Sequence, residues 1–266
     1  MMLRQRVITA VIAVVLILLA LFVFPPPLTL VLLGVLIVAG GWEWSAFLGA
    51  EGAARGLFPG VLAAAIAAVW WAVPQFLPLL PVLLASLGFW LVAAALVVRY
   101  PIRVPRWLIW VGGLATLVPA YLALGTLYMG EPRGPQVVLF VLAVIWSADI
   151  GAYFAGRRFG RVKLAPKVSP GKTWEGVFGG LAAATLVCIA GAWWFGISLA
   201  ILLPLSLAAT LLSIIGDLTV SLFKRSAGVK DSGHLFPGHG GVLDRVDSLA
   251  AASPLFLLML RLLGLA

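Results

Sequence analysis

The segment VITAVIAVVLILLALFVF occupies residues 7–24, carries no charged side chain, and is followed at once by three prolines at 25–27. A helix needs about 20 mainly apolar residues to cross the roughly 30 Å hydrocarbon core of a bilayer. Proline neither donates a backbone hydrogen bond nor continues a helix, so the prolines end this helix. Because a secretory signal has an apolar region of only about 7–15 residues, we expect a retained membrane helix.

The rest of the chain repeats this pattern. The 266 residues are 63% hydrophobic and 10% charged, whereas soluble domains carry about 25% charged residues. Long continuous apolar runs also exclude an outer-membrane barrel, whose strands alternate polar and apolar residues. The predicted fold is an all-α polytopic integral membrane protein with about nine transmembrane helices. The expected spans are 7–24, 28–48, 57–73, 76–98, 107–129, 136–156, 176–195, 197–220 and 246–265.

Lysine and arginine gather in alternate connections between these spans. With the amino terminus in the cytoplasm, all of the 18 basic residues except Arg133 and Arg261 fall on the cytoplasmic side. Membrane proteins carry this excess in their cytoplasmic loops. We therefore expect a multi-pass protein of the inner (plasma) membrane with a cytoplasmic amino terminus. The net charge of +9 follows from this rule and does not indicate a nucleic-acid partner.

The charged residues divide the chain into two regions. All aspartates and all lysines lie between residues 149 and 247. We therefore predict a hydrophobic region of about five spans at 1–148, and a region at 149–266 that carries two charged cytoplasmic loops and any chemistry.

Two aspartates are expected at depths where an ionised group requires a partner or a water-filled cavity. Asp149 and Asp217 each follow an apolar run. On a helix, Asp217, Ser221 and Lys224 are spaced i, i+4 and i+7 and share one face. An internal salt bridge is the structural alternative to a functional site.

Asp244 and Asp247 share a face at the start of the last span, so with Asp217 they form a set of three carboxylates from two helices. Hard cations such as Mg²⁺ take oxygen ligands of this kind. The single cysteine, Cys188, and the spacing of the two histidines exclude an ordinary zinc site.

Glycine-rich loops precede the seventh and the last expected spans. Before the last span, glycines bring backbone amides close to a helix start, which suits phosphate oxygens. His239 in that loop fits a phosphate donor, a general acid or base, or a turn residue equally well. The loop 169–176 places Lys172 and Thr173 before the seventh span. It lacks the pattern of a Walker A loop, and helix capping is its alternative role.

The segment 221–247 resembles the signature of phosphatidate cytidylyltransferases, also called CDP-diacylglycerol synthases. It contains Ser-x-x-Lys-Arg at 221–225, Lys-Asp at 230–231, Pro-x-His-Gly-Gly at 237–241 and Asp-Arg-x-Asp at 244–247. Weaker resemblance covers 149–156 and 163–176, where Ile150 and Gly171 replace the threonine and lysine usual in the family.

The resemblance implies that CTP and phosphatidic acid react to give CDP-diacylglycerol and pyrophosphate, in phospholipid biosynthesis. The enzyme would require Mg²⁺, with a second cation such as K⁺, and would form a homodimer in the lipid bilayer. Two other activities are considered: a related CTP-dependent transferase or kinase acting on a lipid alcohol, and an anion transporter.

The expected site residues follow from the residue pattern and the resemblance together. The expected catalytic residues are Asp217, Asp244, Asp247, Lys224 and Lys172, of which the three aspartates would hold the metal. The expected substrate-binding residues are Ser221, Arg225, Lys230, Asp231, His239, Gly240, Gly241, Arg245, Asp149, Tyr153, Lys167, Ser169 and Thr173.

Overall fold

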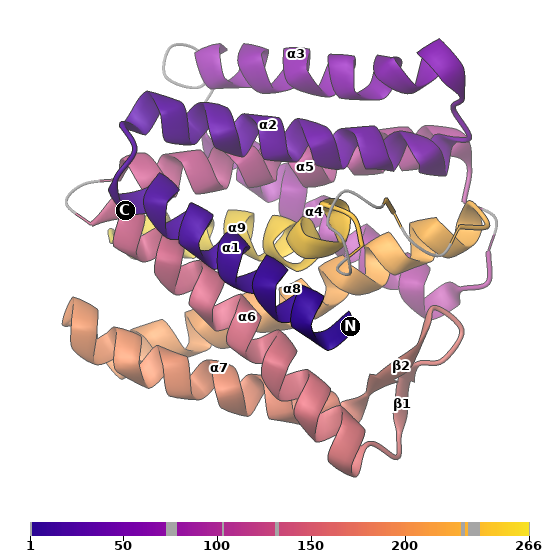
Figure 1. Ribbon diagram of the computed structural model, residues 1–266. Helices are drawn as coiled ribbons and strands as arrows, with labels where there is room; N and C mark the ends of the chain where they lie inside the picture. Colours follow the sequence, from indigo (N-terminus) through magenta and orange to yellow (C-terminus); the bar gives the residue numbers. More distant parts are fainter. Residues whose placement is uncertain are drawn as a thin grey trace.

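The computed structural model describes residues 2–72, 79–102, 104–130, 133–229, 232–233 and 240–265 (Figure 1). Within these ranges the chain forms nine α-helices, two 3₁₀ helices and one hairpin of two strands. The α-helices are α1 (Met2–Phe22), α2 (Pro26–Trp44), α3 (Leu57–Ala72), α4 (Leu79–Arg99), α5 (Arg106–Met129), α6 (Gly134–Phe159), α7 (Trp174–Phe195), α8 (Leu199–Ser226) and α9 (Leu243–Leu262). The 3₁₀ helices are η1 (Ser45–Leu48) and η2 (Gly52–Gly56).

A helix coincides with each expected span, which confirms the all-α polytopic class. In lipid, backbone polar groups must be satisfied within the segment, and the α-helix does this. Seven helices in the described part of the chain are long and apolar enough to cross a membrane. The expected count of nine is not confirmed, because α1 contributes only a shorter apolar stretch, Ile8–Phe22, and α9 is not among the seven. Helix α9 does not qualify as a span because it is too highly charged: its apolar sequence is interrupted by Asp244, Arg245, Asp247 and Arg261.

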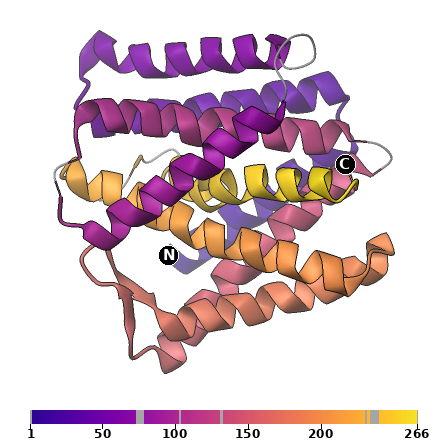
Figure 2. The same cartoon turned by 180° about the vertical axis from the view of Figure 1, so that it is seen from behind.

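The helices pack in layers around α9. Figure 1 shows α2, α3 and α5 running nearly parallel on one side of the molecule and α6 and α7 on the other, with α8 and α9 between them. Figure 2 shows α4 crossing this arrangement obliquely on the opposite face. Helix α9 contacts α2, α4, α5, α6 and α8. Helix α9, which carries Asp244 in its first turn, therefore packs against both regions of the chain.

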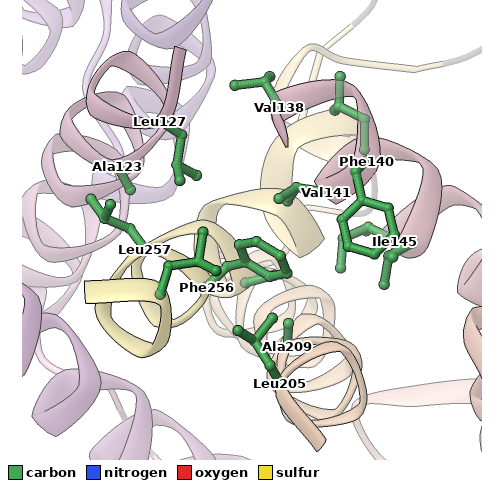
Figure 3. Close-up of a cluster of buried hydrophobic side chains, with 14 of the residues drawn as sticks. Ala123, Leu127, Val138, Phe140, Val141, Ile145, Leu205, Ala209, Phe256 and Leu257 are labelled. Carbon is green, nitrogen blue, oxygen red and sulfur yellow. The ribbon is translucent and has the colours of Figure 1, made fainter. Parts of the chain in front are cut away.

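The largest cluster of buried side chains among the described residues joins seven helices, α1 and α4 to α9, and Figure 3 shows part of it. Phe256 and Leu257 of α9 lie between α5, α6 and α8. Phe256 is packed against Phe140 of α6, with ring centroids 6.0 Å apart. Burying a phenylalanine side chain contributes roughly 1.5–3 kcal/mol in water-soluble proteins; inside lipid, close packing is the main contribution. The cluster holds the far half of α9 in place.

The hairpin between α6 and α7 was not expected from the sequence. Strand β1 (Lys163–Ala165) pairs antiparallel with β2 (Ser169–Thr173), so that Lys163 lies opposite Thr173. Its turn residue Val168 is buried at 1% exposure in the hydrophobic cluster that includes Phe223 and Leu243. This apolar anchor fixes the hairpin against α8 and α9, at the same end of the bundle as the last turn of α8 (Figure 1).

Candidate active site

Lys172 and Asp217 form an ion pair between the hairpin and α8. Lys172 belongs to β2, and its Nζ lies 2.6 Å from Oδ2 of Asp217. Ser221, one turn further along α8, donates a hydrogen bond from its Oγ to Oδ1 of Asp217 at 3.3 Å. The predicted shared face of Asp217 and Ser221 is thus confirmed. Lys172 comes to this face because the buried Val168 anchors its hairpin.

Lys224 and Asp244 form a second ion pair, which joins α8 to the start of α9. The Nζ of Lys224 lies 2.6 Å from Oδ1 of Asp244. The other carboxylate oxygen of Asp244 accepts a hydrogen bond from the backbone N–H of Gly241 at 3.3 Å. Gly240, with φ of +81°, makes the turn that brings this amide back to Asp244. A glycine adopts such a left-handed conformation without the steric penalty of a side chain.

Asp247 and Asp149 extend this charged cluster. Asp247 is buried at 7% exposure, and its Oδ1 accepts a hydrogen bond from the backbone N–H of Ser248 at 2.7 Å. It lies within electrostatic reach of Asp217, Lys172 and Lys224. Asp149 on α6 is exposed. Its charge interacts with those of Asp217, Lys172 and Arg245. The cluster therefore joins α6, the hairpin, α8 and α9.

Two further predicted residues serve the scaffold in this structure. Thr173 accepts a hydrogen bond from the N–H of Gly176 at 3.2 Å and caps α7. The capping role that the sequence left open is therefore the one observed. Arg225 donates from its Nε to the backbone oxygen of Val168 at 3.5 Å, a long bond that ties α8 to the hairpin.

Other predicted residues lie apart from the ion pairs. Tyr153 is exposed on α6, where its hydroxyl accepts a hydrogen bond from Arg157 at 3.0 Å. Lys167 is exposed at the hairpin turn, and Ser169 is half-buried in β2. The three predicted residues Lys230, Asp231 and His239 lie outside the described residues.

The predicted metal site stays a prediction. Within the ranges that the structure describes, no three aspartate, glutamate, histidine or cysteine side chains are close enough together to hold a metal ion. The oxygen donors of Asp217 and Asp247 fit Mg²⁺ in another way. This cation commonly takes one or two carboxylates and completes its shell with water and substrate phosphates.

Glu43 of α2 makes a third carboxylate contact that was not expected from the sequence. Its Oε1 accepts a hydrogen bond from the N–H of Val242 at 3.0 Å. Its Oε2 accepts from the N–H of Leu243 at 2.9 Å and from the Oγ of Ser232 at 3.1 Å. One sequence feature indicated it: Glu43 is an acidic residue within an apolar span, where a carboxylate without a partner costs free energy.

These contacts change the expectation for the glycine turn before α9. The sequence suggested that its amides bind phosphate oxygens. In the structure the amides of Gly241, Val242 and Leu243 already donate to Asp244 or Glu43. Binding of phosphate by Gly240 and Gly241 stays a prediction, and the lysines are the clearer candidates for contact with an anion.

An open groove of about 400 Å³ lies between α4 and α5, away from this cluster. Its lining is apolar apart from Ser86, and it includes Pro81 and Pro119. None of the predicted site residues lines it.

The fold and the cluster together define a class. The chain is a polytopic helical membrane protein in which lysines and carboxylates from distant segments converge at one end of the bundle. Such an arrangement suits the binding of phosphate-bearing substrates, because the ammonium groups neutralise phosphate charge.

Comparison with known proteins identifies the family within this class. The sequence model of the cytidylyltransferase family matches residues 4–263. The chain is 43% identical over 268 residues to a phosphatidate cytidylyltransferase of Pseudomonas aeruginosa, covering 97% of both chains. It is 38% identical over 282 residues to that of Haemophilus influenzae, covering 96% of this chain and 97% of the other. A Brucella suis phosphatidate cytidylyltransferase is 49% identical over 145 residues, about half of each chain. The chain belongs to the cytidylyltransferase family.

Proposed function

We propose that this chain is a membrane enzyme that transfers a cytidylyl group from CTP to phosphatidate, forming CDP-diacylglycerol and releasing pyrophosphate. Similarity over nearly the whole length to two relatives named for this activity supports the proposal. The single structural observation that carries it is the pair of ion pairs, Lys172–Asp217 and Lys224–Asp244, at one end of the helical bundle.

The reaction requires two anions to approach each other. An oxygen of the phosphatidate phosphate attacks the α-phosphorus of CTP, and the bond from that phosphorus to the oxygen bridging the α- and β-phosphates breaks. Repulsion between two unit charges 4 Å apart is about 4 kcal/mol at an effective dielectric constant near 20. Lys172 and Lys224 would offset this repulsion by exchanging their aspartate partners for phosphate oxygens, with Ser221 as a nearby hydroxyl donor. The mechanism needs no nucleophile from the protein.

We further propose that the enzyme depends on Mg²⁺. Of the three expected ligands Asp217, Asp244 and Asp247, the two carboxylates of Asp217 and Asp247 would hold the ion, and water and the substrates would supply the remaining oxygens. When bound, Mg²⁺ neutralises phosphate charge and stabilises the departing pyrophosphate. The family resemblance also supports a second cation such as K⁺ and a homodimer.

The charged end of the bundle would face the cytoplasm in the inner membrane. The distribution of basic residues supports this orientation. Arg157 and Arg158 lie in the last turn of α6, and Arg161 and Lys163 follow before α7, at the same end as the site. CTP would then enter from water while the acyl chains of phosphatidate stay in the bilayer.

Purified protein in detergent with dioleoyl phosphatidate, Mg²⁺ and CTP labelled at its α-phosphate tests this function. We expect the label in a lipid product, together with one pyrophosphate for each product molecule, only when phosphatidate is present. Asp244→Asn removes the charge that holds Lys224 and should lower turnover by about a hundredfold.

Glu51→Gln is the matched control, because Glu51 is exposed and lies outside the charged cluster. It should retain full activity. Incorporation of label without phosphatidate, or undiminished turnover by the Asp244→Asn variant, would contradict the proposal.

A further inference from the structure

Glu43 is a buried carboxylate with partners far away in the sequence. It lies near the end of α2 and is 5% exposed. Val242 and Leu243 lie 199 and 200 residues further along the chain. The hydrogen bonds that described residues donate to the Glu43 carboxylate come from Ser232, Val242 and Leu243, before and at the start of α9. The carboxylate therefore links the N-terminal region directly to the helix that carries Asp244.

These hydrogen bonds cap α9 from another helix. The first amides of a helix have no partner within it, and a side chain usually accepts from them. Val242, the residue that precedes α9, has a side chain that accepts no hydrogen bond. Glu43 fills this role with two oxygens, one for each of two adjacent amides. A carboxylate is also favoured at a helix amino terminus by the helix dipole.

The same carboxylate holds the glycine turn beside Asp244. A Cβ added to Gly241 would collide with Oε2 of Glu43 and with Oγ of Ser232. A Cβ added to Gly233 would collide with Oε1 of Glu43. Both glycines therefore pack directly against Glu43. Since the amide of Gly241 also donates to Asp244, the turn, Glu43 and Asp244 form one connected unit.

We propose that Glu43 is a positioning residue for the reaction: by holding the amides of Val242 and Leu243, it sets Asp244 opposite Lys224. Glu43 acts through Asp244 and does not touch the substrates. The inference rests on the proposed cytidylyl transfer for its kinetic consequences, whereas its structural consequence can be measured without any activity.

Three substitutions of Glu43 separate positioning from filling of space. Glutamine has almost the volume of glutamate but only one acceptor oxygen, so its amide group would face one of the helix amides as a second donor. Aspartate is shorter but keeps two acceptor oxygens. Positioning therefore predicts that Glu43→Asp retains more activity than Glu43→Gln, and packing alone predicts the reverse order. Glu43→Ala removes both properties.

The kinetic experiment measures kcat and KM for CTP and phosphatidate in detergent. We expect kcat to fall by about tenfold to a hundredfold in Glu43→Gln and Glu43→Ala, because small misplacement of a reacting group is costly. Both KM values should change by less than about threefold, since Lys172 and its hairpin are not held by Glu43. Glu51→Gln again serves as the control with unchanged kinetics.

Hydrogen exchange tests the contact independently of turnover. In the Glu43→Ala variant the amides at 242–243 should exchange about tenfold faster or more, while peptides from α6 and α7 keep their rates. Unchanged exchange at 242–243, or higher kcat for Glu43→Gln than for Glu43→Asp, would overturn the inference. A wild-type protein that turns over no CTP, but whose Glu43→Ala variant shows the faster exchange, would refute the proposed function and retain the structural role of Glu43.

Discussion

Lys172 and Asp217 lie 2.6 Å apart, yet their side chains keep 26% and 32% of their surface exposed. Ion pairs with this exposure contribute about 0–1 kcal/mol to stability, because water screens the attraction. Lys172 therefore adds little to the stability of the fold. Binding of an anion by Lys172 is the contribution that stays a prediction.

Replacing Lys172 by methionine should separate its contribution to the stability of the fold from its contribution to turnover. We expect Lys172→Met to lower CTP turnover by about tenfold or more, because one phosphate loses a charge-assisted contact. The free energy of unfolding should change by no more than about 1 kcal/mol. Turnover and the thermal midpoint in detergent would be compared with those of Lys163→Met, which alters an exposed lysine of β1. Equal turnover in the two variants would rule out the role of Lys172.

Single residues also show where sequence reasoning succeeds and where it stops. The helical spacing of Asp217 and Ser221 predicted that they share a face, because both lie on one regular element. Nothing in the spacing of Lys172 and Asp217 indicates that they pair. Glu43 was missed for a similar reason, since its partners are backbone amides about 200 residues away.

Helices α8 and α9 cross closely beside the site. Gly216, which precedes Asp217, faces α9: a Cβ built on it would lie 2.6 Å from the backbone oxygen of Asp247 and 2.7 Å from Cβ of Ala251. The absence of a side chain at Gly216 thus sets the separation of Asp217 and Asp247.

A methyl group at this crossing should affect both stability and activity. We expect Gly216→Ala to lower the free energy of unfolding by roughly 1–3 kcal/mol through overpacking. It should also reduce kcat, because Asp217 and Lys224 of α8 would move relative to Asp244 and Asp247 of α9. Thermal unfolding and kinetics would be measured beside Gly88→Ala in α4, where an added Cβ meets nothing within 4 Å. The explanation fails if Gly216→Ala behaves like that control.

The hairpin is the element that the sequence did not indicate. Its strands have only three and five residues. The hairpin is held beside the site by Val168, whose side chain is buried against other helices. Apolar runs long enough to span a bilayer, in contrast, are recognisable without any knowledge of neighbouring elements. All nine α-helices in the described part of the chain were therefore expected, although only seven helices qualify as membrane spans.

At the scale of the molecule, successive helices bring all elements of the site to one end of the bundle (Figure 1). The start of α2 and the α7–α8 connection lie at the other end, as the alternation of antiparallel helices requires. The charged end and the α7–α8 connection should thus lie on opposite sides of a membrane.

Labelling of single cysteines tests this topology. The native Cys188 is buried and can be replaced by alanine to remove its background. In that protein, Gly171→Cys in the hairpin should react with a membrane-impermeant maleimide only in inside-out vesicles. Ser198→Cys, before α8, should react only in right-side-out vesicles. The opposite pattern would invert the proposed orientation, and labelling of both positions from one side would contradict the arrangement of the helices.

The sequence by itself determined the membrane-embedded helical class, the approximate position of every helix and the signature that points to cytidylyl transfer. These properties depend on local composition and on residues close together in the chain. Only the tertiary structure decided which lysine pairs with which aspartate and that Glu43 holds the start of α9. Such contacts join residues from different helices or from the hairpin and a helix, and the packing of these elements sets their distances.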